Sequence, residues 1–555
     1  MPTLTFSHKD INELVGKKLS IQDIENYAGY GKGELKSYNV DEITINFDDT
    51  NLPYLWSSEG FARLIKGIIS KEKGIPQLKL NKSDHEIIVD PSVNNIRPFI
   101  GAFSAKGRKI DEHLLIQLIQ LQEKVCETYG KRREKIAVGI YSLKKIKFPV
   151  YYKATDPESI KFIPLEFKKE MTQQEILEEH PKGREYKHLL KDFKKYPILI
   201  DSNKEVLSFP PIINSNFTGK VEENDSELFI EATGLDQESL NLALNIFAQA
   251  LYDRGFNIYS CTTNYKDKKI TIPDLNKKTI NLNPKNIEKL LGLKLKDNEV
   301  KNLLEKAQFE YSNNKVTIPP YRGDIMHEVD IIEDIGIMYG YNKINPLELT
   351  SYTTGGTTPK VNFINKIRDL IIGFGFQEIL SQLLTNNENL YKKMNLKDFG
   401  TIEIEDYVSE SYSSVRSWLL PSLLEFLSKN QHVEFPHNIF EEGLVTIKKD
   451  NEIKDIHRLA LVSSHEKANF TDMKSILESL ISSLGLKYEI EETTHSSFIE
   501  GRVARISING KKLAYLGEIH PQVLVNWGLE MPVTALEINL DILFEAAQKT
   551  ITKDF

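Results

Sequence analysis

The sequence is poor in cysteine and contains no long apolar run. Its 555 residues include two cysteines, Cys126 and Cys261, and neither has a second cysteine or a histidine at metal-ligand spacing. We therefore expect no disulfide framework, no structural zinc site and two inert thiols. A membrane-spanning helix needs about 20 consecutive apolar residues, so none is predicted.

Two further absences narrow the possible functions. The N-terminal stretch MPTLTFSHKDINELVG has neither a basic segment before an apolar core nor an arginine-rich pattern, so we expect a cytoplasmic protein. The net charge of -8 argues against a globally basic nucleic-acid binder. One local patch, GKRREK at 130–135, fits either phosphate contacts or a solvated turn after a helix.

Length and periodicity predict a multidomain α+β protein. At roughly 100 to 200 residues per domain, the chain holds roughly three to five domains. Runs such as KIAVGIYSL and SELFIEATG alternate irregularly with helical patterns, which favours α+β over a doubly wound sheet. The predicted parts are an N-terminal α+β domain (1–85), a β-rich domain (86–268), a small helix-rich, winged-helix-like module (269–347), a linker (348–361) and a C-terminal antiparallel sheet domain (362–555).

The first of these parts begins with a predicted strand, TLTF, followed by two short amphipathic helices. Ser7 and Ser20 stand directly before HKDINELVG and IQDIENYAGYG. A serine side chain can accept a hydrogen bond from a free backbone N–H of the first helical turn. Both serines are therefore predicted N-caps.

Residues 321–341, YRGDIMHEVDIIEDIGIMYGY, combine several carboxylates with apolar residues at helical spacing. Asp324 precedes the pattern, and its short side chain makes it the predicted N-cap of a helix over 325–339. Gly340 is the predicted C-cap.

Three acids of this predicted helix share one face. Asp330, Glu333 and Asp334 are related by i, i+3 and i+4 spacing. Like charges at that spacing cost a few tenths of a kcal/mol per pair, so a solvated acidic face is one interpretation. A hard cation such as Mg²⁺, which prefers carboxylate ligands, is the other. The spacing alone does not decide between them.

The same residues carry a family resemblance. PPYRGDIMHEVDIIEDIGIMYGYNKI (319–344) resembles the signature of the beta subunit of phenylalanine-tRNA ligase, with its Arg-x-Asp, Glu-Val-Asp, paired acids and Tyr-Gly-Tyr ending. The resemblance covers essentially the whole chain and is greatest to the archaeal and eukaryotic type. Similar stretches are LIQLQEKVCETYGKRREKIAVGIYSLKKIKFPVYY (118–152), EILEEHPKGREYKHLL (175–190) and LSFPPIINS (207–215).

This resemblance implies an aminoacyl-tRNA synthetase subunit that works in an α2β2 heterotetramer. With the alpha subunit, it would attach phenylalanine to tRNA(Phe) using ATP and Mg²⁺, with ATP and phenylalanine bound mainly by the alpha subunit. The family's magnesium ligands match Asp324, Asp330, Glu333 and Asp334 of this sequence. The resemblance therefore favours the cation over the solvated face.

The C-terminal region resembles a class II synthetase fold that lacks catalytic motifs. A working site needs arginines to hold ATP phosphates and to offset the charge that develops during adenylate formation. The stretch YLGEIHPQVLVNWGL (515–529), which corresponds to the third motif, has no arginine. We therefore expect a non-catalytic domain that packs against the alpha subunit, with core or interface roles for Glu441 and His520.

The β-rich region resembles the family's editing domain, which hydrolyses mischarged Tyr-tRNA(Phe). The matching positions are Leu199, Ser208, Glu231 and Thr233. With no nucleophilic triad visible, we expect water as the nucleophile. Glu231 would accept the phenolic hydrogen bond or orient water, Ser208 and Thr233 would hold the ester and ribose end, and Leu199 would form the floor under the ring.

A few positions depart from the family pattern. Leu52 and Tyr54 replace the usual Arg and Asp, and Val125 and Cys126 stand where Leu and His are common. None of these four is expected to touch a candidate site. Relatives often carry Asp where Glu231 stands, which bears on its editing role. Two alternatives therefore remain open: a non-editing scaffold or tRNA-binding subunit, and a free-standing aminoacyl-tRNA deacylase.

Overall fold

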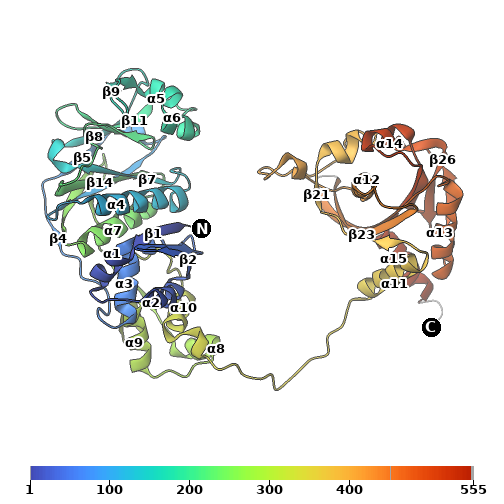
Figure 1. Cartoon of the computed structure of the whole chain (residues 1–555), viewed down its shortest axis with the longest axis horizontal. Helices are drawn as coiled ribbons and strands as arrows, with labels where there is room; N and C mark the ends of the chain where they lie inside the picture. Colours follow the sequence, from blue (N-terminus) through green and yellow to red (C-terminus); the bar gives the residue numbers. More distant parts are fainter. Residues whose placement is uncertain (1, 450–451, 552–555) are drawn as a thin grey trace. The chain divides into compact units, whose positions relative to one another are not determined.

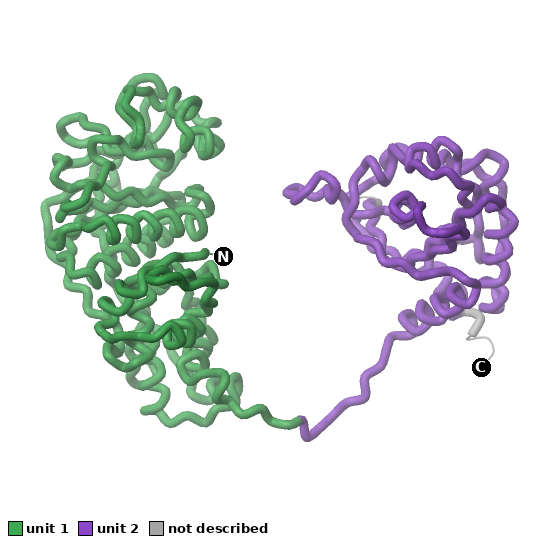
Figure 2. The backbone as a smooth tube through the Cα atoms, in the orientation of Figure 1, with its two compact units in different colours: residues 1–348 green, residues 349–555 purple. Residues whose placement is uncertain are grey.

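The computed structural model describes residues 2–449 and 452–551, and the chain divides into two compact units. Unit 1 comprises residues 1–348 and unit 2 comprises residues 349–555 (Figure 2). Both units combine helices with β-sheets, as the sequence predicts. The described residues 344–358 form no helix or strand.

Unit 1 begins with a three-stranded antiparallel sheet in the order β1-β3-β2, accompanied by short helices. The side chains of Ser7 and Ser20 accept backbone N–H groups at the starts of α1 and α2, which confirms both predicted N-caps. The elements are β1 (Thr3–Ser7), α1 (His8–Val15), α2 (Ile21–Ala28), β2 (Gly33–Asn39), β3 (Glu42–Phe47) and α3 (Ser58–Ile68).

The centre of unit 1 is an eleven-stranded sheet with the main order β13-β12-β11-β8-β5-β15-β6-β14-β7 (Figure 1). Strand β14 lies between β6 and β7, and this places Glu231 opposite Gly139. The strands are β4 (Leu80–Asn81), β5 (Glu86–Val89), β6 (Phe99–Lys106), β7 (Ile136–Ser142), β8 (Val150–Thr155), β11 (Tyr196–Ile200), β12 (Val206–Phe209), β13 (Ile213–Asn214), β14 (Glu227–Gly234), β15 (Asn257–Asn264) and β16 (Lys269–Ile272).

Helices α4 (Glu112–Lys124) and α7 (Gln237–Asp253) pack between the N-terminal three-stranded sheet and the eleven-stranded sheet (Figure 1). One hydrophobic core contains Phe6 of β1, Leu118 of α4 and Phe247 of α7. The N-terminal elements and the large sheet therefore share buried apolar surface, which is the main favourable term in packing them together.

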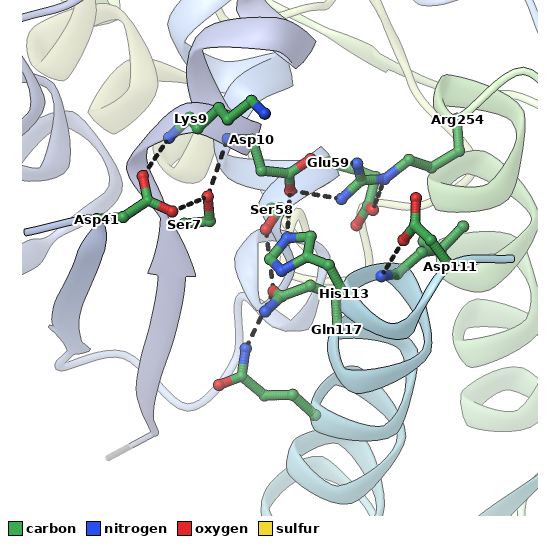
Figure 3. Close-up of polar contacts among 12 residues, drawn as sticks. Ser7, Lys9, Asp10, Asp41, Ser58, Glu59, Asp111, His113, Gln117 and Arg254 are labelled. Atoms are coloured by element: carbon green, nitrogen blue, oxygen red, sulfur yellow. Dashed lines mark hydrogen bonds and ion pairs between the residues drawn. The ribbon is translucent and has the colours of Figure 1, made fainter. Parts of the chain in front are cut away.

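A buried ion-pair network joins the same parts (Figure 3). Arg254, which follows α7, is bonded to Glu59 of α3 and to Asp10 of α1, with Arg254 Nη2 2.7 Å from Asp10 Oδ2. Burial by itself raises the pKa of Asp10, but the hydrogen bonds and charge of Arg254 hold that pKa below its ordinary value. Removing one partner of a buried pair typically costs about 3–5 kcal/mol.

The last part of unit 1 is a small module of helices around a three-stranded sheet in the order β17-β19-β18. Its core includes Phe309, Val316 and Ile335. The elements are β17 (Lys278–Asn281), α8 (Pro284–Leu291), α9 (Asp297–Lys306), β18 (Glu310–Ser312), β19 (Lys315–Ile318) and α10 (Glu328–Tyr339).

Helix α10 begins later than the sequence predicts. His327, and not Asp324, is its N-cap, with His327 Nδ1 accepting the N–H of Val329 at 3.3 Å. The prediction for Asp324 is wrong because its carboxylate is bonded to Arg322 instead. The predicted C-cap is confirmed, since Gly340 ends the helix at φ 93°, where a residue without Cβ is favoured.

Unit 2 is built on a seven-stranded sheet in the order β20-β23-β24-β28-β27-β26-β25, antiparallel except where β20 pairs with β23. One core lies against α11, α13 and α15, and a second lies against α12 and α14, so helices cover both faces. The elements are α11 (Pro359–Gly373), β20 (Gln377–Glu378), α12 (Leu420–Lys429), β23 (His437–Lys449), β24 (Glu452–Ser464), α13 (Phe470–Ser483), β25 (Glu489–Glu492), β26 (Phe498–Ile508), β27 (Lys511–Ile519), α14 (Pro521–Trp527), β28 (Val533–Asn539) and α15 (Leu540–Ile551).

Glu441 and His520 both have structural partners in this unit. Glu441 is fully buried, and its Oε1 lies 2.6 Å from Nη1 of Arg416. His520 is the N-cap of α14, where its Nδ1 accepts the N–H of Gln522 at 3.0 Å. Across residues 2–449 and 452–551, no helix is long and apolar enough to cross a membrane.

Candidate functional site

A cavity of about 650 Å³ opens in unit 1 beside β7, β12 and β14. Helix α4 forms one wall. Three loops contribute further lining residues, which lie within 165–168, 210–212 and 216–221. This size lies within the range of roughly 300–1,000 Å³ usual for small-molecule pockets. The lining residues with polar or ionisable side chains are Gln122, Glu123, Cys126, Arg133, Glu166, Lys168, Lys182, Ser208, Asn214, Asn216, Lys220, Glu231 and Thr233.

Glu231 is the buried carboxylate of this cavity, with 3% of its surface exposed. The hydroxyl of Tyr141 donates to Glu231 Oε1 at 2.8 Å, whereas Oε2 has no hydrogen-bond partner. Burial raises the pKa of Glu231 to about 7, against the opposing effects of the Tyr141 hydrogen bond and the charge of Arg97. The group therefore changes protonation near neutral pH and keeps one oxygen free for a ligand.

Ser208 lines the cavity from β12, and its buried Oγ makes no hydrogen bond of full geometry, although the side chain lies near enough to the Tyr141 hydroxyl to lower the pKa of that group. Leu199 is its register partner on β11, but it lies in the hydrophobic core and does not line the cavity. Directly paired residues of antiparallel strands normally share a face, but the register between β11 and β12 shifts at Leu199/Ile200, and such an irregularity re-aims side chains. The predicted floor role of Leu199 therefore needs correction: it supports the strand that carries Ser208.

Thr233 is held by a buried arginine. Arg97 donates from Nε to Thr233 Oγ1 at 3.0 Å and from Nη2 to the carbonyl of Thr233 at 2.8 Å. Burial lowers the pKa of Arg97 to about 10, because no carboxylate forms an ion pair with it within the described part of the chain. Since Thr233 Oγ1 accepts from the arginine, the threonine hydroxyl can still donate its own hydrogen to another group.

Gly139 keeps this site open. A Cβ at this position would lie 2.4 Å from the Tyr141 hydroxyl and 2.7 Å from Glu231 Oε1. Both distances are well below van der Waals contact, so any larger residue would displace the Tyr141–Glu231 pair. The glycine is required here by close approach and not by its backbone angles.

Sequence reasoning did not identify Tyr141, Arg97, Gly139 or Asn214. Asn214 Oδ1 lies 3.2 Å from the Tyr141 hydroxyl, and the single hydroxyl hydrogen can be donated only to one of its two acceptors at a time. The register between β7 and β14 brings Tyr141 and Glu231 together across 90 residues. The only available signal was a glycine inside the strand pattern IAVGIYS, which often marks close approach.

Two of the family departures touch candidate sites, contrary to expectation. Cys126 lines the cavity, and burial raises the pKa of its thiol to about 11, so it stays protonated as predicted for an inert thiol. The ring of Tyr54 lies under Arg322, with 4.7 Å between the guanidinium carbon and the ring centroid. Tyr54 therefore belongs to the surroundings of the acidic cluster.

The acidic cluster is neutralised by the chain's own cations. Nη2 of the buried Arg322 lies 2.5 Å from Asp324 Oδ2 and 2.8 Å from Asp334 Oδ2. Burial raises the pKa of Asp334, although Arg322 opposes this effect. The guanidinium thus occupies the space between the two carboxylates that a cation would take.

The other two acids point to different partners. Asp330 Oδ2 accepts the N–H groups of Met326 and His327, both at 2.8 Å, and Glu333 Oε1 lies 2.9 Å from Lys32 Nζ. Among the described residues, no three or more His, Cys, Asp or Glu side chains are grouped so that they could hold a metal ion. The four acids therefore do not fit the hard, multi-oxygen coordination that Mg²⁺ requires.

Comparison with known proteins identifies the family. Curated phenylalanine–tRNA ligase beta subunits from Pyrococcus abyssi and Pyrococcus horikoshii are each 45% identical to this sequence over 98% of the chain and 100% of the relative. The chain belongs to the phenylalanine–tRNA ligase beta subunit family. A subunit of this family from Methanosphaera stadtmanae is 36% identical over 97% of the chain and 99% of the relative.

Family models and a solved structure agree with this assignment to the phenylalanine–tRNA ligase beta subunits. The model of the phenylalanyl tRNA synthetase beta chain CLM domain matches residues 346–540, and the tRNA synthetase B5 domain matches residues 280–341. The crystal structure of an N-terminal fragment of the beta subunit from Pyrococcus horikoshii has a TM-score of 0.60 and 45% identity, and covers 61% of this chain and 100% of the fragment. The B5 match contains the acidic cluster, and the fragment supports the mixed fold of unit 1.

Proposed function

We propose that this chain works with an alpha subunit in an α2β2 phenylalanine-tRNA ligase, acts in the cytoplasm and hydrolyses mischarged Tyr-tRNA(Phe) in the cavity of unit 1. Ligation takes place on the alpha subunit, which binds ATP and phenylalanine. Support comes from the family and from unit 2, where the 515–529 segment has no arginine for a triphosphate and where Glu441 is fully engaged with Arg416. Magnesium belongs with the ATP on the alpha subunit, since the acids of this chain have partners of their own.

The observation that carries the editing proposal is the pair of unsatisfied buried atoms in one cavity, Glu231 Oε2 and Ser208 Oγ. Buried polar groups are nearly always hydrogen-bonded, so two open ones on the same cavity indicate that a ligand with polar ends satisfies them. A tyrosyl ester has such ends: a phenolic hydroxyl at one side and an ester with ribose hydroxyls at the other.

In this proposal Glu231 selects tyrosine. Its deprotonated Oε2 accepts the phenolic hydrogen, and phenylalanine leaves that buried oxygen without a partner. A site built to hydrogen-bond a hydroxyl rejects the analogue lacking it far more strongly than an apolar pocket rejects an added hydroxyl. Correctly charged Phe-tRNA(Phe) is therefore spared.

Hydrolysis uses water as the nucleophile. Its oxygen bonds to the ester carbonyl carbon, the bond from that carbon to the ribose oxygen breaks, and the ribose oxygen leaves with a proton as the tRNA hydroxyl. Free tyrosine is the second product. Ser208 and Thr233 hold the ester and ribose end, and Arg97 keeps Thr233 in place. These groups contribute orientation, which is the main catalytic resource of a site without a protein nucleophile.

The test uses the purified chain with its alpha subunit and measures deacylation of Tyr-tRNA(Phe) and of Phe-tRNA(Phe). Glu231→Ala and Thr233→Val are expected to reduce tyrosine release by tenfold or more, on the order of the loss of one charge-assisted or neutral hydrogen bond. Glu227→Ala is the matched control, because Glu227 lies on the same strand but pairs with Lys106 away from the cavity lining.

Three outcomes separate the alternatives. No tyrosine release by the wild-type complex indicates a non-editing scaffold or tRNA-binding subunit. Release by the isolated chain, together with no gain of aminoacylation when the alpha subunit is added, indicates a free-standing deacylase. Aminoacylation by the mixture alone, with tyrosine release that depends on Glu231, supports the proposal.

A further inference from the structure

A second cavity, of about 620 Å³, lies in unit 2, and its lining shares no residue with the cavity of unit 1 or with the acidic cluster. Its lining residues lie within 374–376 after α11, 435–438 at the start of β23, 463–466 at the end of β24 and 472–476 in α13, together with Met531 before β28. Neither Glu441 nor His520 is among them. This unit 2 cavity falls within the range of roughly 300–1,000 Å³ usual for small-molecule pockets, and a small ligand in it is contacted from several sides without a partner subunit.

More than half of the residues that line the unit 2 cavity are apolar. Phe376 and Met473 are 6% and 1% exposed and belong to a hydrophobic core of unit 2, so this side of the cavity is fixed by the fold. The ring of Phe435 stacks on His437, with 4.1 Å between the ring centroids. The apolar lining also includes Phe374, Ile476 and Met531. Aromatic rings supply a large apolar area and methionine adapts to irregular shapes, so the cavity favours a ligand with an apolar body.

The charged residues of this lining are acidic, and no lysine or arginine is among the lining residues that the structure describes. Asp472 Oδ2 accepts from Asn469 Nδ2 at 2.7 Å, and Asp472 forms no ion pair within the described part of the chain. Glu466 Oε1 lies 3.6 Å from Lys467 Nζ, but both side chains are largely exposed, so water screens this pair. His465 Nδ1 accepts the N–H of Lys467 at 3.3 Å, and a ring nitrogen that accepts a hydrogen bond carries no proton. His465 is therefore neutral in this arrangement, and the lining has a net negative charge.

The two neutral polar residues of the lining contact each other. Ser463 Oγ donates to Asn438 Oδ1 at 2.6 Å, and neither group carries a charge that would offset the carboxylates. The unit 2 cavity thus combines aromatic and thioether surface with the negative charge of Glu466 and Asp472. This combination is complementary to a cation that has an apolar body.

We infer that the unit 2 cavity binds a small organic cation, with a primary ammonium group on Glu466 and Asp472 and an alkyl or aromatic body against the phenylalanines and methionines. Ionised carboxylates form strong, charge-assisted hydrogen bonds with N–H donors, and the faces of aromatic rings attract cations. A nucleotide or another anion is disfavoured, because the lining has no cation to hold its phosphates. Binding of the amine is separate from ligation on the alpha subunit and from editing, since the lining shares no residue with the cavity of unit 1.

The first experiment is an isothermal titration of the complex of this chain with its alpha subunit. The probe is hexylamine, and hexan-1-ol and hexanoate are its neutral and anionic counterparts of similar size. Because hexylamine lacks the ring and the carboxylate of phenylalanine, it is a poor ligand for the amino-acid site of the alpha subunit. Hexan-1-ol is expected to bind roughly 10- to 100-fold more weakly than hexylamine, the range for losing a hydrogen bond to a charged group, and hexanoate more weakly still. No binding of hexylamine, or equal affinities for the amine and the alcohol, would overturn the inference.

Variants of this chain assign the binding to the cavity. Glu466→Gln combined with Asp472→Asn should weaken hexylamine binding by roughly 10- to 100-fold and leave hexan-1-ol binding unchanged, because the charge of the lining is removed and its size is kept. Unchanged binding of the alcohol also shows that the double variant is folded. Glu478→Gln is the matched control, since Glu478 is an exposed acid of α13 outside the lining. Hexylamine binding that stays the same in the double variant contradicts the role of the two carboxylates.

A second sample separates the amine from another occupant of the cavity, a segment of the alpha subunit. The same titration is made with this chain alone. Binding of hexylamine by the complex and by the isolated chain, with the same dependence on Glu466 and Asp472, upholds the inference. Binding by the isolated chain but not by the complex would mean that the alpha subunit fills the cavity, and the inference would be wrong.

Discussion

The hydroxyl of Tyr141 lies 2.8 Å from one carboxylate oxygen of Glu231, while the other carboxylate oxygen has no partner. This asymmetry gives one oxygen a structural role and leaves the second for a ligand. Burial also raises the pKa of Tyr141 well above its ordinary value, reinforced by the Glu231 charge, so the phenol remains a hydrogen-bond donor at every physiological pH. The first predictions concern this pair.

Tyr141→Phe should move the pH dependence of editing. The hydrogen bond from Tyr141 lowers the pKa of Glu231, so its removal should raise that pKa further above about 7. Tyrosine recognition needs the carboxylate, so kcat/KM for Tyr-tRNA(Phe) should rise with pH in the wild type and reach its plateau at a higher pH in the variant. Tyr196→Phe is the control, because Tyr196 is also buried but its hydroxyl donates to Gln174, outside the cavity lining. Superimposable pH profiles for Tyr141→Phe and the wild type would show that the hydrogen bond does not set the pKa.

Glu231→Gln should stabilise the protein at high pH. The pKa of Glu231 is raised from 4.5 to about 7, so its contribution to stability is fully present below pH 4.5 and is lost as the pH rises through about 7. Glutamine does not ionise and avoids this loss, which amounts to at most about 3 kcal/mol. Thermal melting should therefore show a higher Tm for the variant at pH 8.5 and nearly equal Tm values at pH 4.5. A variant that is less stable at both pH values would indicate that the lost carboxylate bonds outweigh the relief of charge.

Gly139→Ala should close the site without unfolding the sheet. Its Cβ would collide with Tyr141 and Glu231 at 2.4 and 2.7 Å, so those side chains must move. We expect loss of Tyr-tRNA(Phe) deacylation by tenfold or more and a destabilisation of about 1–3 kcal/mol, typical of overpacking. Gly373→Ala serves as the control, because nothing lies within 4 Å of its Cβ position. Full editing activity in Gly139→Ala would mean that the Tyr141–Glu231 geometry is dispensable.

Arg322→Met should destabilise unit 1 by about 3–5 kcal/mol, because it leaves Asp324 and Asp334 buried without a counter-charge. Glu333 lies on α10, as Asp334 does, and Lys32→Met removes the ion-pair partner of Glu333. That pair is partly exposed and should contribute less than about 1 kcal/mol to the free energy of unfolding. Chemical denaturation of the two variants measures the difference. Similar small losses in both would mean that Arg322 is not the counter-charge of the cluster.

Magnesium should have no effect on the stability of the wild-type chain. A ligand that binds only the folded state raises Tm with its concentration, so a magnesium site on the four acids would be visible in a melting series. We expect equal Tm values in EDTA and in millimolar Mg²⁺. A Tm that rises with Mg²⁺ in the wild type, and not in Asp334→Asn, would establish a metal site and require Arg322 to move aside.

Local sequence signals were sufficient for many elements. Ser7 and Ser20 were recognised as N-caps, and Gly340 as a C-cap, because capping depends on a few adjacent residues. The start of α10 differs from the prediction because the carboxylate of Asp324 binds Arg322 and does not cap the helix. That ion pair forms only when folding buries both side chains together. Ser208, Glu231 and Thr233 line one cavity and Leu199 does not, whereas the roles of these residues in editing stay predictions.

The order of residues alone determined the family, the periodic elements and the polar side chains available for chemistry, because these depend on residue type and spacing. Tertiary structure decided which of those side chains are free. Arg322 reaches two acids that a helical-face argument left to a cation, and strand register places Tyr141 against one oxygen of Glu231 and leaves the other open. Ion pairs and hydrogen bonds join side chains that are close in space but far apart in the sequence, and the spacing of residues along the chain does not show which of them meet.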